Sequence, residues 1–347
     1  MSMSNLKNSF SHLTSIVLGS GRMGQRFLQL LKELEISVVA VNDPRRESLE
    51  AGLKLTPQAE GYSDAAELFR RHSAPLVIVA STATSHAELT VLAAEHGAKF
   101  IVCEKPMAVS LAQAEEMIAC CKKHGVQLAV NHQMRFMPQY VRLKEFFASP
   151  EFGRLSSMTT IAGNFGITMN GSHYIEALRY VSGSDPVEVT AWLEESGAPN
   201  PRGAEFVEKA GCLRVTTASG VRLYVDCSGS QGHGIQTVYG SQFGQLVVDE
   251  MRGALYGVCR QGRDRDLPST RIGTEPTLVR EDIEPVEVMA PTREVLCALL
   301  EGRSVCGPEE GLLILRTLVA AYLSDEQGHR CVKLSEDLPR ERLFPWA

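Results

Sequence analysis

The chain has 347 residues, of which 44% are hydrophobic, 22% charged and 6% aromatic. This composition excludes a disordered or fibrous protein, and the length predicts two domains. Lys and Arg number 35 against 41 Asp and Glu, a formal net charge of −6. That charge disfavours nucleic acid or an anionic membrane surface as a partner.

The sequence predicts a cytoplasmic protein without a membrane segment. No apolar stretch approaches the roughly 18 residues of a spanning helix, and the first apolar run, Ile16 to Leu18, ends at Gly19. We therefore expect no signal peptide. The nine cysteines are odd in number and never take a C-x-x-C spacing, so we expect reduced thiols and no metal site.

Up to about residue 130, short apolar runs alternate with amphipathic segments. The pattern predicts strands at 15–18, 38–41, 76–80, 100–103 and 126–130, and helices over 23–34, 64–72, 86–96 and 110–125. Ser110, followed three residues later by Gln113, is expected to begin the last of these helices, and Gly125 to end it. Because the strands lack polar alternation, both sheet faces should be covered, as in a doubly wound parallel sheet.

After Asn131 the pattern changes to longer, alternating segments. Strands are predicted at 155–162, 187–194, 212–217, 221–227, 246–249 and 254–260, and helices at 292–301 and 308–325. Ser219-Gly220 predicts a tight hairpin, so this sheet should be mostly antiparallel with one solvated or interface face. Residues 261–284 are rich in charge, Gly and Pro and are predicted to form a loop.

A glycine-rich motif, Gly19-Ser20-Gly21-Arg22-Met23-Gly24, follows the first predicted strand and opens the first predicted helix. Gly19 would permit a tight turn, Gly21 would let the backbone approach a pyrophosphate, and Gly24 would allow close packing of the helix on the sheet. Alone, such a motif is often an ordinary glycine-rich turn. The flanking strand and helix favour dinucleotide binding.

Asp43 ends the second predicted strand, 19 positions after Gly24. A carboxylate there can accept hydrogen bonds from both ribose hydroxyls of NAD and would repel the 2′-phosphate of NADP. NAD is therefore the expected cofactor. Arg45 and Arg46 follow at once and either neutralise a phosphate, which would admit NADP, or belong to a solvated turn.

Glu104-Lys105-Pro106 follows the strand that ends at Cys103. Ligands of doubly wound sheets bind outside such strand ends, so Lys105 is expected near the nicotinamide. Partial burial would lower the pKa of Lys105 and let it exchange a proton with a substrate hydroxyl. The competing interpretation is a surface lysine in a loop.

The chain resembles the Gfo/Idh/MocA family, which includes glucose-fructose oxidoreductase and inositol dehydrogenases. The resemblance lies in VLGSGRMG (17–24), VAVND (39–43), TATSH (82–86), CEKPMA (103–108), GSHYIEALR (171–179) and SDEQG (324–328). It implies an α/β protein with a dinucleotide-binding Rossmann domain, residues 1–130, followed by an α/β domain, residues 131–347, with a large, mostly antiparallel open sheet. One face of that sheet would bind substrate and the other would join subunits into a homodimer or homotetramer.

The resemblance also implies roles for individual residues. Lys105 corresponds to the family's catalytic lysine and His173 is expected to face the substrate beside it. Thr82, His86 and Glu104 would lie on the cofactor side, although His86 equally fits the first turn of a helix. Arg135, after the strand at the domain junction, would bind substrate or form an interdomain ion pair.

The chain departs from the family at Met169, where dehydrogenases similar to inositol dehydrogenase have an aspartate four residues before the histidine. Methionine cannot take a proton. Either Lys105 and His173 suffice, or Asn170 supplies a neutral hydrogen bond to substrate, or the reaction is altered. Glu176, one helical turn after His173, could orient its imidazole.

These residues predict an NAD(P)-dependent oxidoreductase. It would transfer a hydride between nicotinamide and a hydroxyl or keto carbon of a sugar, cyclitol or sugar derivative, possibly nucleotide-linked. The alternatives are a dinucleotide-binding sensor or regulatory protein without turnover, which Met169 motivates, and an NAD-dependent glycoside-cleaving enzyme. Cys120 and Cys121 are expected to be packing thiols, and His124 is assigned no role.

Overall fold

The computed structural model describes residues 10–163, 165–195, 200, 203, 206–232, 234–266, 277–283 and 287–346. They divide into two compact units. The first comprises the described residues up to His132, Thr292–Leu315 and those from Arg340 onward; the second comprises those from Gln133 to Pro291 and Arg316–Pro339. Among the described residues, no helix is both long and apolar enough to cross a membrane.

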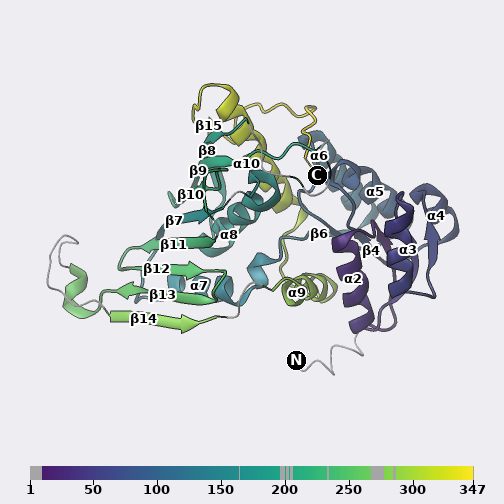
Figure 1. The fold of residues 1–347 in the computed structure, drawn as a ribbon, viewed down its shortest axis with the longest axis horizontal. Helices are drawn as coiled ribbons and strands as arrows, with labels where there is room; N and C mark the ends of the chain where they lie inside the picture. Colours follow the sequence, from purple (N-terminus) through teal and green to yellow (C-terminus); the bar gives the residue numbers. More distant parts are fainter. Residues whose placement is uncertain are drawn as a thin grey trace. The chain divides into compact units, whose positions relative to one another are not determined.

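The first unit contains a six-stranded parallel sheet in the order β3-β2-β1-β4-β5-β6; Figure 1 labels β4 and β6 of this sheet. The strands are β1 (Thr14–Leu18), β2 (Ser37–Asn42), β3 (Glu60–Tyr62), β4 (Leu76–Val79), β5 (Phe100–Cys103) and β6 (Gln127–Val130). The connecting helices are α2 (Arg22–Glu33), α3 (Arg46–Leu55), α4 (Ala65–Arg71), α5 (Ala83–Glu95) and α6 (Leu111–His124). The predicted doubly wound parallel sheet is confirmed.

Local chemistry sets several of these boundaries. The Ser110 hydroxyl accepts a hydrogen bond from the Gln113 amide at 3.2 Å, and Gly125 ends α6 with φ +68°. Asp64 begins α4 in the same way, accepting from the Glu67 amide at 2.6 Å. Each such cap satisfies a backbone group that the helix itself leaves unpaired.

The C-terminal part of the chain returns to the first unit, whereas the sequence analysis assigned all residues after 130 to the second domain. Helix α9 (Met289–Leu300) and helix α10 (Pro308–Glu326) follow one another, and the Val130 amide donates to the Cys306 carbonyl at 2.8 Å. A Cβ on Gly311 would lie 2.6 Å from Val130 Cγ2, so only glycine lets α10 pack this closely on β6. Trp346, fully buried, stacks on Phe344.

The second unit contains a nine-stranded sheet in the order β14-β13-β12-β11-β7-β10-β9-β8-β15. Its strands are β7 (Leu155–Ala162), β8 (Pro186–Leu193), β9 (Gly211–Thr217), β10 (Arg222–Asp226), β11 (Ile235–Ser241), β12 (Gly244–Asp249), β13 (Ala254–Cys259), β14 (Thr277–Asp282) and β15 (Val332–Lys333). Strands β7 and β10 pair in parallel and the other neighbours antiparallel. The mostly antiparallel sheet is confirmed.

The predicted loop over 261–284 was wrong in part. Gly262–Asp266 forms a short 3-10 helix, and β14 pairs along its whole length with β13. Strand β14 contains Arg280, Glu281 and Asp282, and this charge concealed the strand at the sheet edge. Residues 267–276 and 284 lie outside the described part of the chain.

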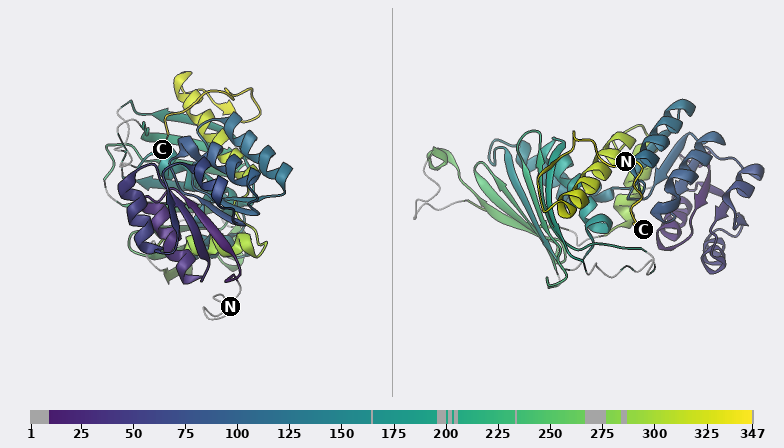
Figure 2. Two further views of the ribbon diagram at one scale, coloured as in Figure 1. Left: turned by 90° about the vertical axis from the view of Figure 1, so that its right-hand side faces the viewer. Right: turned by 90° about the horizontal axis from the view of Figure 1, so that it is seen from above.

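The two faces of this sheet differ. Helix α8 (Ser172–Ser182) packs against β7 and β10 on one face, and α7 (Pro138–Ala148) contacts α8. Figure 2 shows the sheet edge-on in its right-hand view. On the opposite face, called here the open face, Ile161, Trp192, Tyr224 and Tyr256 are 51%, 46%, 39% and 43% exposed. The strand register places all four on this face.

Candidate functional site

The glycine-rich loop connects β1 to α2 and requires its glycines for steric reasons. Gly19 has φ +91°, and a Cβ there would lie 2.5 Å from the Ser81 amide nitrogen. A Cβ on Gly24 would lie 1.9 Å from the Gly19 carbonyl oxygen. Any side chain at either position would therefore force the loop away from the sheet edge.

The N-terminus of α2 suits an anion. Gly21 precedes the helix, provides no side-chain cap, and no acidic residue lies in the first turn. The first amides, those of Arg22, Met23 and Gly24, have no partner within the helix. Unpaired amides and the positive end of the helix dipole together favour a phosphate group. The loop therefore fits a dinucleotide pyrophosphate.

Asp43 lies beside the loop and holds it. Its carboxylate accepts from the Ser20 amide at 2.8 Å and from the Arg45 amide at 2.9 Å, one at each oxygen. The side chain is almost fully buried. The sequence predicts that Asp43 binds the ribose hydroxyls. In the structure its carboxylate already accepts hydrogen bonds from the glycine-rich loop and from the segment that follows β2.

The two arginines after Asp43 differ. Arg45 has an exposed side chain whose Nε lies 3.4 Å from the Asp43 carboxylate, and its Nη2 would lie 3.3 Å from a Cβ on Gly21. Arg46 begins helix α3 and pairs with Glu50 at 2.7 Å. Arg45 lies in an exposed bend just before the helix, as the solvated-turn alternative has it, and of the two arginines it is Arg45 whose guanidinium lies beside the glycine-rich loop.

His86 connects the ends of β4 and β5. It is buried in the first turn of α5, where Nε2 lies 3.2 Å from the Ser81 carbonyl and Nδ1 lies 2.9 Å from the Pro106 carbonyl. Thr82, half-buried, precedes α5, and its hydroxyl lies 3.2 Å from that of Thr84.

Lys105 follows β5 at the carboxyl edge of the parallel sheet. Its side chain is buried, and the peptide bond to Pro106 is cis. The Glu104 carboxylate accepts from the Asn131 amide group at 2.6 Å and from the Lys105 backbone at 3.3 Å. Glu104 therefore ties the ends of β5 and β6 together. Burial raises the pKa of the thiol of Cys103, the last residue of β5.

In the second unit, a π-helical turn, η2 (Ile167–Gly171), leads directly into α8. The Gly171 amide donates to the Gly166 carbonyl at 3.1 Å, the five-residue spacing of a π-helix. Asn170 is half-buried in this turn, and His173, 8% exposed, is in the first turn of α8. Wide turns of this kind occur often at functional sites.

Glu208, which the sequence analysis did not single out, holds this turn. One oxygen of its buried carboxylate accepts from the Thr168 amide at 2.7 Å and from the Met169 amide at 3.1 Å. A Cβ on Gly166 would overlap Glu208, only 1.8 Å from Cγ. The Glu208 carboxylate therefore contacts the backbone of Met169. This is the position at which dehydrogenases similar to inositol dehydrogenase are expected to have an aspartate.

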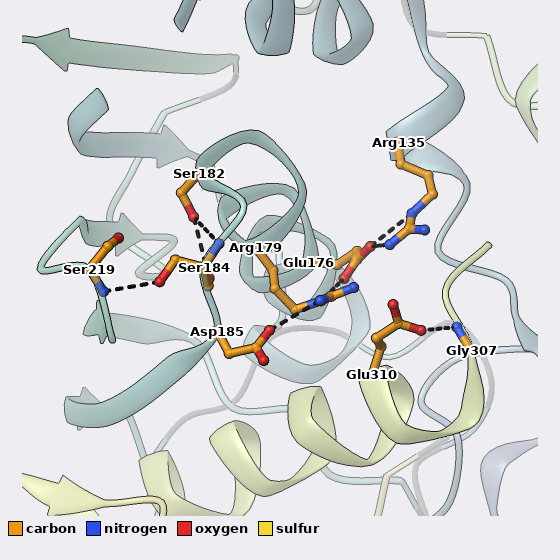
Figure 3. Close-up of polar contacts among 9 residues, drawn as sticks. All are labelled: Arg135, Glu176, Arg179, Ser182, Ser184, Asp185, Ser219, Gly307 and Glu310. Carbon is orange, nitrogen blue, oxygen red and sulfur yellow. Dashed lines mark hydrogen bonds and ion pairs between the residues drawn. The ribbon is translucent and has the colours of Figure 1, made fainter. Parts of the chain in front are cut away.

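Glu176 pairs with arginines, not with the His173 imidazole as proposed from the sequence (Figure 3). One carboxylate oxygen accepts from the buried guanidinium of Arg135, with Nε at 2.9 Å, and the other accepts from Arg179 at 3.1 Å. The Arg179 guanidinium also donates through Nη1 to the Asp185 carboxylate at 3.1 Å. Arg135 and Glu176 belong to the same unit, so this pair is not interdomain.

These contacts change the view of Arg135. The residue lies in a 3-10 helix, η1 (Gln133–Phe136), and its guanidinium also faces the Tyr180 ring at 5.4 Å. A buried guanidinium held by a carboxylate and an aromatic face has fewer donors left for a substrate. The sequence could not reveal this, because Glu176 is 41 residues away.

Comparison with known proteins agrees with this geometry. Residues 13–132 match the model of an oxidoreductase family with an NAD-binding Rossmann fold, GFO_IDH_MocA. A D-apiose dehydrogenase from Paraburkholderia graminis is 27% identical, with 92% of this chain and 88% of the relative covered. The chain belongs to the Gfo/Idh/MocA oxidoreductase family.

Other members extend the similarity. An inositol 2-dehydrogenase from Serratia proteamaculans is 27% identical over 89% of this chain and 94% of that protein. Among solved structures, an oxidoreductase from Agrobacterium radiobacter, crystallised with NAD+, L-tartaric acid and magnesium, shares the fold with a TM-score of 0.77 at 19% identity. The alignment covers 93% of this chain and 98% of that one. This Gfo/Idh/MocA protein is an NAD-binding oxidoreductase.

Proposed function

We propose that this Gfo/Idh/MocA protein interconverts a hydroxyl and a keto carbon on a sugar, cyclitol or sugar derivative, with NAD as hydride carrier. The observation that carries the proposal is the shared edge of β1, β4 and β5. There the glycine-rich loop contacts Ser81, His86 connects Ser81 to Pro106, and Lys105 immediately precedes Pro106. The loop proposed to bind the dinucleotide and the lysine proposed to transfer the proton thus follow strands at one edge of one sheet, which supports the proposal.

The chain's own residues would hold the cofactor as follows. The amides at the start of α2 would bind the pyrophosphate, with Gly21 admitting it without steric hindrance. Asp43 would accept hydrogen bonds from the adenosine ribose, and Thr82 and His86 would border the nicotinamide half. When bound, NAD supplies the acceptor or donor of the hydride.

Lys105 would act as the general base in oxidation and as the general acid in reduction. Oxidation of a CH–OH group removes a hydride from carbon and a proton from oxygen, and a neutral Lys105 amine would accept that proton; reduction would return it. His173 would hydrogen-bond the reacting hydroxyl, and Asn170 would bind a neighbouring one. The D-apiose and inositol dehydrogenases among the relatives support a polyhydroxylated substrate.

NAD is the proposed cofactor over NADP because the buried Asp43 carboxylate would face the ribose. Arg45 is the residue that would tolerate a 2′-phosphate, since its exposed guanidinium lies beside Gly21. We further propose a homodimer or homotetramer, joined through the open face.

The test is NADH formation by the full chain with a panel of cyclitols, aldoses and nucleotide-linked sugars. Lys105→Met should lower kcat by roughly 10²- to 10⁴-fold, the usual contribution of a general acid or base. Affinity for NADH, measured by nicotinamide fluorescence, should stay the same. Lys99→Met, an exposed lysine at the opposite end of β5, is the matched control.

Undiminished turnover in Lys105→Met would remove Lys105 from the reaction. Tight NADH binding without turnover of any polyol or keto sugar would instead favour the regulatory alternative that Met169 motivates. Release of the chromophore from a chromogenic glycoside, dependent on NAD+, would identify the glycoside-cleaving alternative.

A further inference from the structure

Three side chains of metal-ligand type meet between helices α5 and α6 of the first unit. Glu95 is the last residue of α5, and Cys120 and His124 lie in the last two turns of α6. One ligand atom from each lies within 4.8 Å of the other two. Glu95 is nine residues beyond His86, about 13 Å along the helix, so this cluster is separate from the glycine-rich loop.

The helical repeat explains why these residues meet. Cys120 and His124 are four residues apart and share one flank of α6, while Cys121 points into the core. Val91 and Glu95 form the matching row on α5, and the Cys120 sulfur lies 3.9 Å from the Val91 carbonyl oxygen. The row on α5 therefore faces the row on α6, and Glu95, Cys120 and His124 lie together near the C-terminal ends of the two helices.

The surroundings favour a cation. Nε2 of His124 is buried and has no hydrogen-bond partner among the described residues, although buried ring nitrogens are normally satisfied. Both helices end here, so the negative ends of two helix dipoles face the cluster.

We propose that Glu95, Cys120 and His124 bind a thiophilic divalent cation, best matched by Zn²⁺, which joins the ends of α5 and α6. Thiolate, imidazole and carboxylate are the ligands zinc prefers, and they disfavour Mg²⁺ and Ca²⁺. Zinc–ligand bonds are about 2.0–2.3 Å long, so the three ligand atoms would move slightly closer together on binding. A water molecule would take the fourth coordination position. Binding releases the thiol proton to solvent.

The experiment uses the full chain, freed of metal with a chelator and kept reduced with a phosphine. Co²⁺ is titrated first, because a bound thiolate gives a charge-transfer band in the near ultraviolet, and Zn²⁺ then displaces it. We expect one equivalent of Co²⁺ with that band. Cys120→Ser and His124→Gln should each weaken binding at least about 100-fold, and Glu95→Gln about tenfold.

Two matched controls are Cys331→Ser, which removes the exposed thiol, and Glu116→Gln, which removes a carboxylate outside the cluster. Both should retain the band and the stoichiometry. Zn²⁺ should raise the Tm of the wild-type chain and of the controls, and leave that of Cys120→Ser unchanged. Glu95 is exposed, so Glu95→Gln reports on binding even where a buried substitution harms folding.

Either of two results would overturn the proposal. One is a wild-type chain without a charge-transfer band, and the other is binding that survives unchanged in both Cys120→Ser and His124→Gln. The zinc site has no part in hydride transfer, so its failure leaves the proposed function untouched.

Discussion

At the scale of single residues, Asp43 combines two functions that sequence patterns treat as one. Its oxygens hold the amides of Ser20 and Arg45, which fixes the loop, and the same charge would select the ribose of NAD. Separating the two functions requires a change that keeps the shape and removes the charge.

Asp43→Asn keeps the shape and removes the charge, and its NH2 group also gives up the hydrogen bond from one of the two backbone amides. We expect the Kd for NADH to rise on the order of tenfold, about 1.4 kcal/mol, because a charged acceptor becomes neutral. The Kd for NADPH should fall, because repulsion of the 2′-phosphate disappears and Arg45 remains. Fluorescence titration measures both values. Adding Arg45→Gln should abolish the NADPH gain, whereas adding Arg46→Gln, paired with Glu50, should not; equal NADPH binding in all three would refute the role of Arg45.

Glu250 is a buried acid with a different consequence. It is 4% exposed and accepts from the hydroxyls of Tyr140, at 2.5 Å, and Tyr174, at 3.3 Å. Burial raises its pKa above the ordinary value for glutamate. A raised carboxyl pKa means that the folded state binds this proton more tightly than the unfolded state does.

The free energy of unfolding should therefore fall as pH rises from about 4 through the folded-state pKa of Glu250. The slope from one group is at most about 1.4 kcal/mol per pH unit. Glu250→Gln, neutral at every pH, should remove this component, and urea unfolding between about pH 4 and pH 8 measures it. Parallel pH profiles for the two proteins would show that Glu250 is not the group responsible.

At the scale of elements, the turn before α8 depends on a residue far away in sequence. Glu208 holds the Thr168 and Met169 amides from a segment outside any helix or strand, 40 residues away. Glu208 thus keeps a carboxylate beside the backbone of Met169, where the sequence comparison with inositol dehydrogenases leads one to expect an aspartate.

Glu208→Ala should lower the free energy of unfolding by about 1–3 kcal/mol, because two buried amides lose their acceptor. It should also lower kcat by displacing the start of α8 and with it His173. Glu208→Gln keeps an acceptor oxygen and should restore most of both, while Glu195→Ala, at an exposed glutamate, is the control. Urea unfolding measures the change in stability, and steady-state kinetics measure the change in kcat. Full activity and stability in Glu208→Ala would contradict the proposed role of Glu208 in holding the turn before α8.

The elements that the sequence predicted are those with strong local signals. The apolar strands β1, β4 and β5 and the capped helix α6 were predicted close to their observed bounds. Strands β3, β11, β14 and β15 and helices α3, α7 and α8 were not predicted; β3 and β15 are only three and two residues long, and β14 is rich in charged residues. The cluster of Glu95, Cys120 and His124 was not predicted either, because Cys120 and His124 share a helix at a four-residue spacing but Glu95 comes from another helix.

For the candidate site, the sequence located the loop glycines, Asp43, Lys105 and His173, since motif and element order mark them. It could not assign the partners. The pairing of Arg135 with Glu176, the contacts of His86 with two carbonyls and the role of Glu208 all depend on tertiary folding. Their binding and catalytic roles stay predictions for the experiments above.

At the scale of the whole molecule, the open face is the surface that assembly would use. Ile161, Trp192, Tyr224 and Tyr256 expose aromatic and aliphatic area on one sheet face, and exposed apolar patches commonly mark protein interfaces. A stable dimer buries roughly 800 Å² on each partner, an area that a nine-stranded sheet can provide.

We expect the wild-type chain to be a dimer or tetramer by light scattering after size-exclusion chromatography. The double variant Trp192→Arg, Tyr224→Arg should shift it toward monomer, because two cations would then be buried against their copies. Leu343→Arg, at an exposed leucine of the first unit, should leave the mass unchanged. A monomeric wild-type chain would disprove assembly through this face.

The return of the chain's end to the first unit has a consequence for biosynthesis. The Phe344 amide bonds to the Val109 carbonyl at 2.9 Å and Trp346 is fully buried. A ribosome that has made the first 132 residues has therefore not yet supplied the aromatic pair that completes their hydrophobic interior. The first unit would acquire its full stability only once Phe344 and Trp346 have been synthesised and have packed against it.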